Sequence, residues 1–189
     1  MKRYTACLIL LVPLVGVTDS LIKALAFLLV FSVIAVLHRI LMQMLAPLLD
    51  AEQKWLASAL IAATLATCAE TGVLLQAPDL HKALGIYLPL MAIHCLQIQT
   101  VRIGRYALCG YAFLMLSLGF LRELLGNGTI LSNAHWLFGN SAIQWQISLP
   151  APALHMATLA PGGFILLGLL LAAYNALTRP TPSKEIPFS

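Results

Sequence analysis

The sequence predicts an all-α polytopic integral membrane protein, with six transmembrane helices in two inverted three-helix repeats. Of the 189 residues, 60% are hydrophobic and 10% are charged, whereas soluble domains carry about 25% charged residues. Apolar runs of membrane-spanning character recur along the chain as far as residue 177. Two of these runs contain a proline where a straight helix would otherwise continue. We therefore expect residues 1–189 to form a single membrane domain in which the first and fourth helices are broken.

The first predicted segment, residues 5–18, is shorter than the roughly 20 residues that a straight crossing requires. A lysine and an arginine precede it, as in a signal peptide, but no small-x-small cleavage pattern precedes the next polar residues, so we expect it to be retained. Pro13 predicts that this segment crosses as a broken helix. Asp19 and Ser20 then predict a helix cap before the second segment, residues 21–37.

Residues 38–54 contain most of the charges of this region and an amphipathic run that is typical of the membrane interface. The third segment, residues 55–75, is rich in alanine and serine, which allow helices to approach closely. Glu70 lies inside this segment, where a carboxylate is costly unless it is protonated or paired. Two interpretations stay open for it: a role in ion passage, or a hydrogen bond to Thr67 near the membrane edge.

The fourth segment, residues 84–101, contains Pro89 in its middle and His94 and Cys95 shortly after it. A proline removes a backbone donor and kinks a helix, and irregular backbone at membrane depth survives where it lines a site. The run at residues 12–18 repeats the same proline pattern, so we expect two paired half-sites. Adjacent residues on a helix point about 100° apart, so His94 and Cys95 make a poor two-ligand clamp.

The fifth segment, residues 106–125, ends in a Gly-Asn-Gly-Thr run suited to a left-handed turn. We expect Arg122 and Glu123 at this end to form a capped pair facing the interface, with an ion path as the alternative. A long loop then leads to the sixth segment, residues 156–177. Two further cysteines, Cys68 and Cys109, have no polar neighbours that would activate a thiol, so we expect both to be buried by packing.

The basic residues predict the orientation of the chain. With a cytoplasmic N-terminus, six crossings put eight lysines and arginines inside and three outside, in accord with the positive-inside rule. Both termini are then cytoplasmic, and the halves 1–76 and 77–189 point in opposite directions. Inverted repeats of this kind place a site at the midplane between their broken helices. The net charge of +4 resides in loops, so it gives no indication of nucleic-acid binding.

Three motifs resemble those of one protein family. Residues 121–129 read LRELLGNGT, residues 84–90 read LGIYLPL, and residues 13–18 read PLVGVT. Their order and spacing along the chain resemble those of the NqrD/RnfE family. Members of this family are membrane subunits of the Rnf electron-transport complex and of the sodium-pumping NADH:quinone reductase. This chain resembles the RnfE branch. Residues 159–169 are similar to the opening of the sixth helix in that family. The resemblance covers roughly residues 8–176.

The resemblance implies a [2Fe-2S] cluster at the midplane, shared with a homologous sister subunit of opposite topology. Carried over by position, Cys95 is one ligand, preceded by His94 where the family usually has asparagine. The position of the other family cysteine in this chain is Val12, which cannot ligate iron. His94 could substitute, since histidine replaces cysteine in some clusters; Cys7 could serve instead; or the cluster is lost or altered.

Two functions follow from the resemblance. The first is a membrane subunit of an ion-translocating electron-transport complex in the bacterial inner membrane, coupled to Na⁺ or H⁺ movement. The alternative is a cluster-free structural or ion-conducting paralogue that holds a partner subunit. The sequence contains no nucleotide-binding loop, CxxC motif or nucleophile elbow. Any catalysis therefore belongs to the assembled complex rather than to this chain alone.

Overall fold

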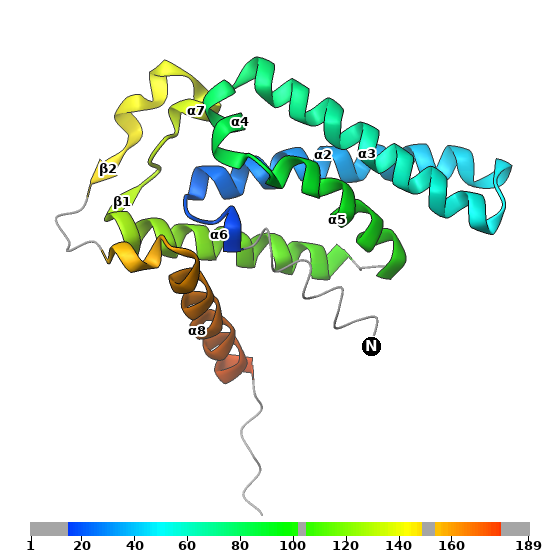
Figure 1. Ribbon diagram of the computed structural model, residues 1–189. Helices are drawn as coiled ribbons and strands as arrows, with labels where there is room; N and C mark the ends of the chain where they lie inside the picture. Colours follow the sequence, from blue (N-terminus) through cyan, green and yellow to red (C-terminus); the bar gives the residue numbers. More distant parts are fainter. Residues whose placement is uncertain (1–14, 102–104, 149–153, 179–189) are drawn as a thin grey trace, which may run out of the picture.

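The computed structural model describes residues 15–101, 105–148 and 154–178, and the described chain is predominantly helical (Figure 1). Its helices are α2 (Leu21–Leu45), α3 (Ala51–Gln76), α4 (Pro78–Leu84), α5 (Tyr87–Val101), α6 (Arg105–Asn127), α7 (His135–Phe138) and α8 (Ala160–Thr178). Short 3-10 turns lie at Ala46–Leu48, Asn140–Trp145 and His155–Ala157. Two strands, β1 (Thr129–Ile130) and β2 (Ile147–Ser148), pair antiparallel with Thr129 opposite Ser148.

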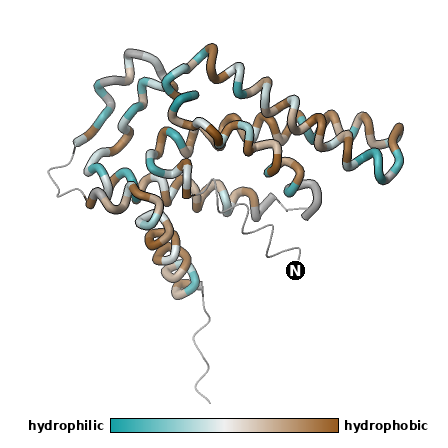
Figure 2. The backbone as a smooth tube through the Cα atoms, viewed as in Figure 1, coloured by the Kyte–Doolittle hydropathy of each residue, from teal (hydrophilic) through white to brown (hydrophobic). Residues whose placement is uncertain are grey.

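Four of the described helices, namely α2, α3, α6 and α8, are long and apolar enough to cross a membrane. Apolar residues cover these helices along most of their length (Figure 2). The polytopic all-α fold class is therefore confirmed. The fourth predicted segment, residues 84–101, corresponds to the 15-residue α5, and an interruption separates it from the 7-residue α4. The prediction of a break in the middle of this segment is therefore wrong, since the interruption lies just before α5. The first predicted segment lies largely in residues 1–14, outside the described residues.

Helix α2 continues eight residues beyond its predicted end at residue 37, because the sequence contains no helix breaker before Pro47. Pro47 falls inside the 3-10 turn that follows. The amphipathic run predicted to lie at the interface therefore begins as the last turns of α2. One consequence is that His38, expected at the start of a loop, is a buried residue of the helix.

Helices α3 and α4 also differ from the prediction at their ends. Helix α3 begins at Ala51, four residues early, and Gln53 Oε1 accepts a hydrogen bond from the Asp50 N–H at 3.2 Å. Residues 76–83, which lie between the third and fourth predicted segments, are mostly helical, since Pro78 occupies the first position of α4, where a proline costs no hydrogen bond. The short link between the two helices leaves α4 next to the end of α3.

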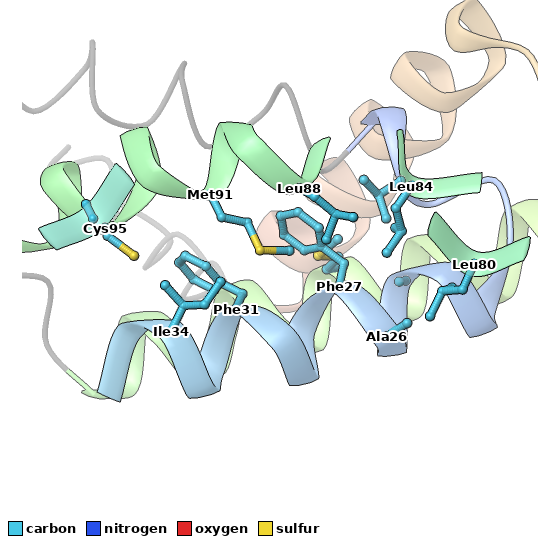
Figure 3. Packing of buried hydrophobic residues seen from close by; sticks show 13 residues of the cluster. Ala26, Phe27, Phe31, Ile34, Leu80, Leu84, Leu88, Met91 and Cys95 are labelled. Carbon is cyan, nitrogen blue, oxygen red and sulfur yellow. The ribbon is translucent and has the colours of Figure 1, made fainter. Parts of the chain in front are cut away.

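The main core lies where α2 and α5 face each other (Figure 3). Phe27, Phe31 and Ile34 on α2 are at most 6% exposed, as are the α5 residues that they meet. Helix α3 covers this pair through small buried side chains spaced four residues apart: Ser58, Ala62 and Ala66. That spacing puts all three on one helix face and permits the close approach expected from the sequence.

The far end of α6 and the start of α8 are joined by the segment that contains the β1–β2 hairpin and α7. Gly128, with φ of 61°, provides the left-handed turn predicted after α6. Beyond this segment, α8 projects away from the other helices (Figure 1). Only 11% of its spanning window is buried, against 39% for α2.

Candidate functional site

Helical structure is interrupted near each of the two predicted half-sites, at a first break in residues 17–20 and at a second break between α4 and α5. The second break lies at Gly85 and Ile86. Gly85 has φ of 45° and ψ of −123°, a conformation that side chains with a Cβ rarely adopt. Its N–H still donates to the His81 carbonyl at 2.8 Å and so ends α4. Pro89 lies two residues inside α5, in the first turn, where no intrahelical hydrogen bond is lost. The interruption therefore precedes Pro89 instead of lying at it, and it is made by the glycine rather than by the proline.

Cys95 lies two turns after this break, on the face of α5 that meets α2. It is 3% exposed, and its side chain points toward α2 beside Ile34 and Phe31 (Figure 3). His94 is also buried, but its Nδ1 lies 2.8 Å from the Leu90 carbonyl of its own helix, and its ring meets Phe31 edge-on. The two side chains are therefore held by different contacts and do not form a two-ligand clamp.

The donor set limits what this chain can hold. Among the described residues, no group of three or more histidine, cysteine, aspartate or glutamate side chains is placed to bind a metal ion. Cys95 is a buried soft ligand and fits one position of an iron-sulfur cluster. Since the Leu90 carbonyl engages Nδ1 of His94, a metal would have to use Nε2 of that ring. The other candidate positions, Val12 and Cys7, lie outside the described residues. Any cluster would thus need further ligands from a partner or from those residues.

The first break covers residues 17–20, which separate the helical residues Val15 and Gly16 from α2. A Cβ on Gly16 would overlap the ring of Tyr87, the first residue of α5. Only glycine leaves room for this approach, because any side chain would need the volume that the Tyr87 ring occupies. The two interrupted helices therefore meet, one residue before the first break and one residue after the second.

Arg122 on α6 closes one side of the first break. Its Nη1 donates to the Val15 carbonyl and to Thr18 Oγ1, the latter at 3.0 Å. The Val15 carbonyl belongs to the helical end before the break, where backbone acceptors lack partners and where positive charge is favoured. The side chain is 2% exposed, so these hydrogen bonds form inside the protein. This differs from the prediction, which placed Arg122 at the interface.

The rest of the Arg122 guanidinium binds the turn that precedes α8. Its Nε donates to the Ala157 carbonyl at 3.0 Å, and its Nη2 donates to the carbonyls of Thr158 at 2.6 Å and Leu159 at 3.3 Å. An arginine has five N–H donors, and all five are used here. This complete pairing offsets the cost of burying the charge.

Glu123, the next residue, closes the other side of the first break. Its Oε2 accepts from the Leu21 N–H at 2.7 Å and from Ser20 Oγ at 3.3 Å. Leu21 is the first residue of α2, so the carboxylate satisfies an unpaired donor at the positive end of that helix. Ser20 holds the predicted cap position, but its hydroxyl binds Glu123 and makes no cap of its own. The other oxygen, Oε1, accepts from the Ser132 N–H at 2.5 Å.

Charged neighbours surround this arrangement. Asp19, which follows Thr18 in the first break, is one of them. Asp19 Oδ2 accepts from Lys23 Nζ at 2.6 Å, and that ammonium lies 5.9 Å from the centre of the Trp136 ring. The opposite charges of Arg122 and Glu123 thus stand among further polar groups rather than in apolar packing.

Three other predicted residues have surroundings that differ from the expectation. Glu70 faces His81 of α4, with Oε1 and Nε2 3.5 Å apart, so its neighbour is not Thr67, whose hydroxyl donates to backbone carbonyls of α3. Cys68 and Cys109 are exposed rather than buried. Both thiols lie on outward faces of their helices and are available as control positions.

His38 and Ser58 were not identified as a pair from the sequence. His38 Nε2 lies 3.1 Å from Ser58 Oγ and 3.2 Å from the Ser58 carbonyl, linking α2 to α3 within the protein. One feature of the sequence could have predicted this pair: His38 ends an apolar run, and no helix breaker follows it directly. Such a residue belongs to the helix, and a buried imidazole needs a polar partner.

The fold and this site define a polytopic α-helical membrane protein whose two interrupted helices meet in its interior. A family model for the Rnf-Nqr subunit, described as a membrane protein, matches residues 4–171. The chain belongs to this Rnf-Nqr family. The LRELLGNGT motif that resembles the family thus contains the two residues, Arg122 and Glu123, that close the first break.

Its relatives include proteins named as the E component of an ion-translocating oxidoreductase complex. The protein from Pseudomonas aeruginosa strain LESB58 is 32% identical over 183 residues, which cover 88% of this chain and 76% of the relative. The protein from Shewanella oneidensis is 28% identical over 190 residues, covering 93% and 82%. That from Cellvibrio japonicus is 26% identical over 183 residues, covering 88% and 77%.

Proposed function

We propose that this chain is a membrane subunit of an ion-translocating oxidoreductase complex in the bacterial inner membrane. It passes electrons across the membrane through a [2Fe-2S] cluster shared with a homologous sister subunit of opposite topology, and this transfer is coupled to Na⁺ or H⁺ movement. The observation that supports the proposal most is the meeting of the two interrupted helices at Gly16 and Tyr87 in a chain of this family. Inverted repeats place their sites at such positions.

In this proposal Cys95 supplies a thiolate ligand, and the sister subunit supplies the ligands that this chain lacks. When bound, the cluster would act as a one-electron carrier. The apolar side chains of Phe31 and Ile34 around Cys95 keep water away from its sulfur, and the closed second break fixes the start of the helix on which it lies. His94 contacts the Leu90 carbonyl of its own helix through Nδ1, so a metal would have to use its Nε2.

The test is to purify the assembled complex, measure iron per copy and record the electron paramagnetic resonance of the reduced sample. Cys95→Ala should remove the cluster signal and electron transfer. Cys68→Ala and Cys109→Ala are matched controls, since both thiols are exposed, and both variants should keep the signal. Full iron content in Cys95→Ala would refute Cys95 as a ligand.

A second candidate is a cluster-free subunit that holds its partners in place. Two observations favour it: Cys95 packs against apolar side chains of its own chain, and residue 12 is a valine. An assembled complex that lacks iron at this site in the wild type would support this candidate. Val12→Cys should then raise the iron content if the sister subunit offers its own pair of cysteines.

The proposed orientation has its own test. A reporter fused after residue 105 should be cytoplasmic, and one fused after residue 133 should be periplasmic. Residues 105 and 133 lie at opposite ends of α6 and its following turn, so one crossing separates them. The reverse result would exclude cytoplasmic termini and with them the inverted arrangement of 1–76 and 77–189.

A further inference from the structure

We propose that Arg122 couples the position of α8 to the first break, so that a displacement of one is transmitted to the other. The guanidinium is the shared element. Two of its N–H groups hold the first break through Val15 and Thr18, and three hold the turn before α8 through consecutive carbonyls. Because all five donors are engaged, the guanidinium cannot follow one side without losing hydrogen bonds to the other.

The residues around the Arg122 guanidinium are closely packed, so the start of α8 and the first break have little room to move separately. A Cβ on Gly163, in the first turn of α8, would lie 3.1 Å from Arg122 Nη1 and 3.1 Å from Val15 Cγ1. A Cβ on Gly126 of α6 would overlap the Thr158 side chain. The start of α8 therefore contacts both Arg122 and the last helical residues before the first break. The start of α8, Arg122 and the first break therefore pack as one contiguous group.

The remainder of α8 is mostly exposed. Its spanning window is 11% buried, and Gly168, five residues after Gly163, has nothing within 4 Å of the place where a Cβ would stand. One face of the helix still packs into the protein, because Leu167 is buried against Val15 and Leu118. The coupling does not depend on the proposed cluster, although its use in redox chemistry would rest on that function.

The experiment reads the first break through a buried thiol. In full-length chain in membranes, with the four native cysteines replaced by alanine, Val17→Cys provides the probe, since Val17 lies in the break and is 1% exposed. The rate of its modification by N-ethylmaleimide reports opening. Ser58→Cys, 2% exposed on α3, is a matched probe of the main core away from Arg122.

Gly163→Ala and Gly168→Ala make the same change on the same helix, one against Arg122 and Val15 and the other in open space. We expect Gly163→Ala to raise modification of the Val17→Cys probe several-fold, and Gly168→Ala to leave it unchanged. The Ser58→Cys probe should respond to neither. Equal rates for the two alanine variants would overturn the proposal, as would a parallel increase at Ser58→Cys, which would indicate general loosening.

Arg122→Gln and Arg122→Lys test the role of the guanidinium. Arg122→Gln should itself expose the Val17→Cys probe, and adding Gly163→Ala should then have no further effect, because the connection is already lost. Arg122→Lys keeps the charge and three donors, so it should restore part of the protection. A full additional effect of Gly163→Ala in Arg122→Gln would overturn the role of Arg122. The alanine pair keeps Arg122 and decides the coupling even if Arg122→Gln does not fold.

Discussion

The two helix breaks of this protein are held by different means. At the second break, the backbone closes itself: Gly85 adopts a conformation open to glycine and donates to the preceding turn. At the first break, side chains from a distant helix do this work, with Arg122 on the carbonyl side and Glu123 on the N–H side. One break is thus encoded locally and the other by tertiary contacts.

The difference shows two ways in which a membrane protein can interrupt a helix and still give its backbone groups protein partners. An interruption leaves carbonyls without donors on one side and N–H groups without acceptors on the other. A cation and an anion in adjacent positions of a neighbouring helix match both needs at once. Four single-residue variants distinguish the side-chain closure of the first break from the backbone closure of the second. The expected loss of stability decreases from the first of these variants to the last.

Arg122→Met should have the largest effect on stability. It leaves several buried carbonyls without a donor, and each unpaired buried group costs about 1–3 kcal/mol. Thermal unfolding in detergent measures the loss. Arg39→Gln, at an exposed position of α2, is the control and should unfold like the wild type. A loss for Arg122→Met no greater than for this control would show that the first break does not depend on the charge.

Gly16→Ala should come next. The added methyl overlaps the Tyr87 ring and pushes the two interrupted helices apart, and overpacking of this kind costs about 1–3 kcal/mol. Gly110→Ala, in open space on α6, should not destabilise the protein. If the two variants unfold at the same temperature, the breaks do not meet as described.

Gly85→Ala should cost about 1–2 kcal/mol, because an L-residue in this left-handed conformation is strained. The loss should be smaller than that of Arg122→Met, since only one residue is affected and the surrounding hydrogen bonds persist. Denaturant or thermal unfolding ranks the two variants. The opposite ranking would contradict the view that the first break is the more dependent on side chains.

Pro89→Ala should have the smallest effect, within about 0.5 kcal/mol of the wild type. Pro89 is in the first turn of α5, where its missing N–H would have had no intrahelical acceptor. A similar unfolding temperature, measured beside Gly85→Ala, would show that the glycine makes the break. A large loss for Pro89→Ala would restore the proline to the role that the sequence suggested.

Hydrophobicity and local turn chemistry account for what was predictable. The long apolar helices and the turn at Gly128 follow from features within a few residues. The sequence favours Pro89 as the breaker because proline interrupts helices more strongly than glycine, yet proline is also favoured at helix starts. The charge at Arg39 predicts an earlier end for α2 than the structure has, because an exposed arginine is equally compatible with a continuing helix.

The contacts of Arg122 and Glu123 could not be predicted in the same way. Their partners at the first break lie 102 to 107 residues away in the sequence, and no periodicity within a segment indicates such pairs. From the sequence alone, two charges near the end of an apolar run fit an interfacial pair equally well. For Cys95, the resemblance supplied the position and the structure supplied its surroundings, and whether it binds iron stays a prediction.

The long sequence distance between the first break and Arg122 affects how the protein is made. At about 5–20 residues per second, the ribosome adds α6 roughly 5–20 seconds after the N-terminal segments have emerged. During that interval the carbonyls beside the first break and the start of α2 lack Arg122 and Glu123. Residues 15–21, which these two side chains contact, therefore reach their final arrangement only after α6 has been added.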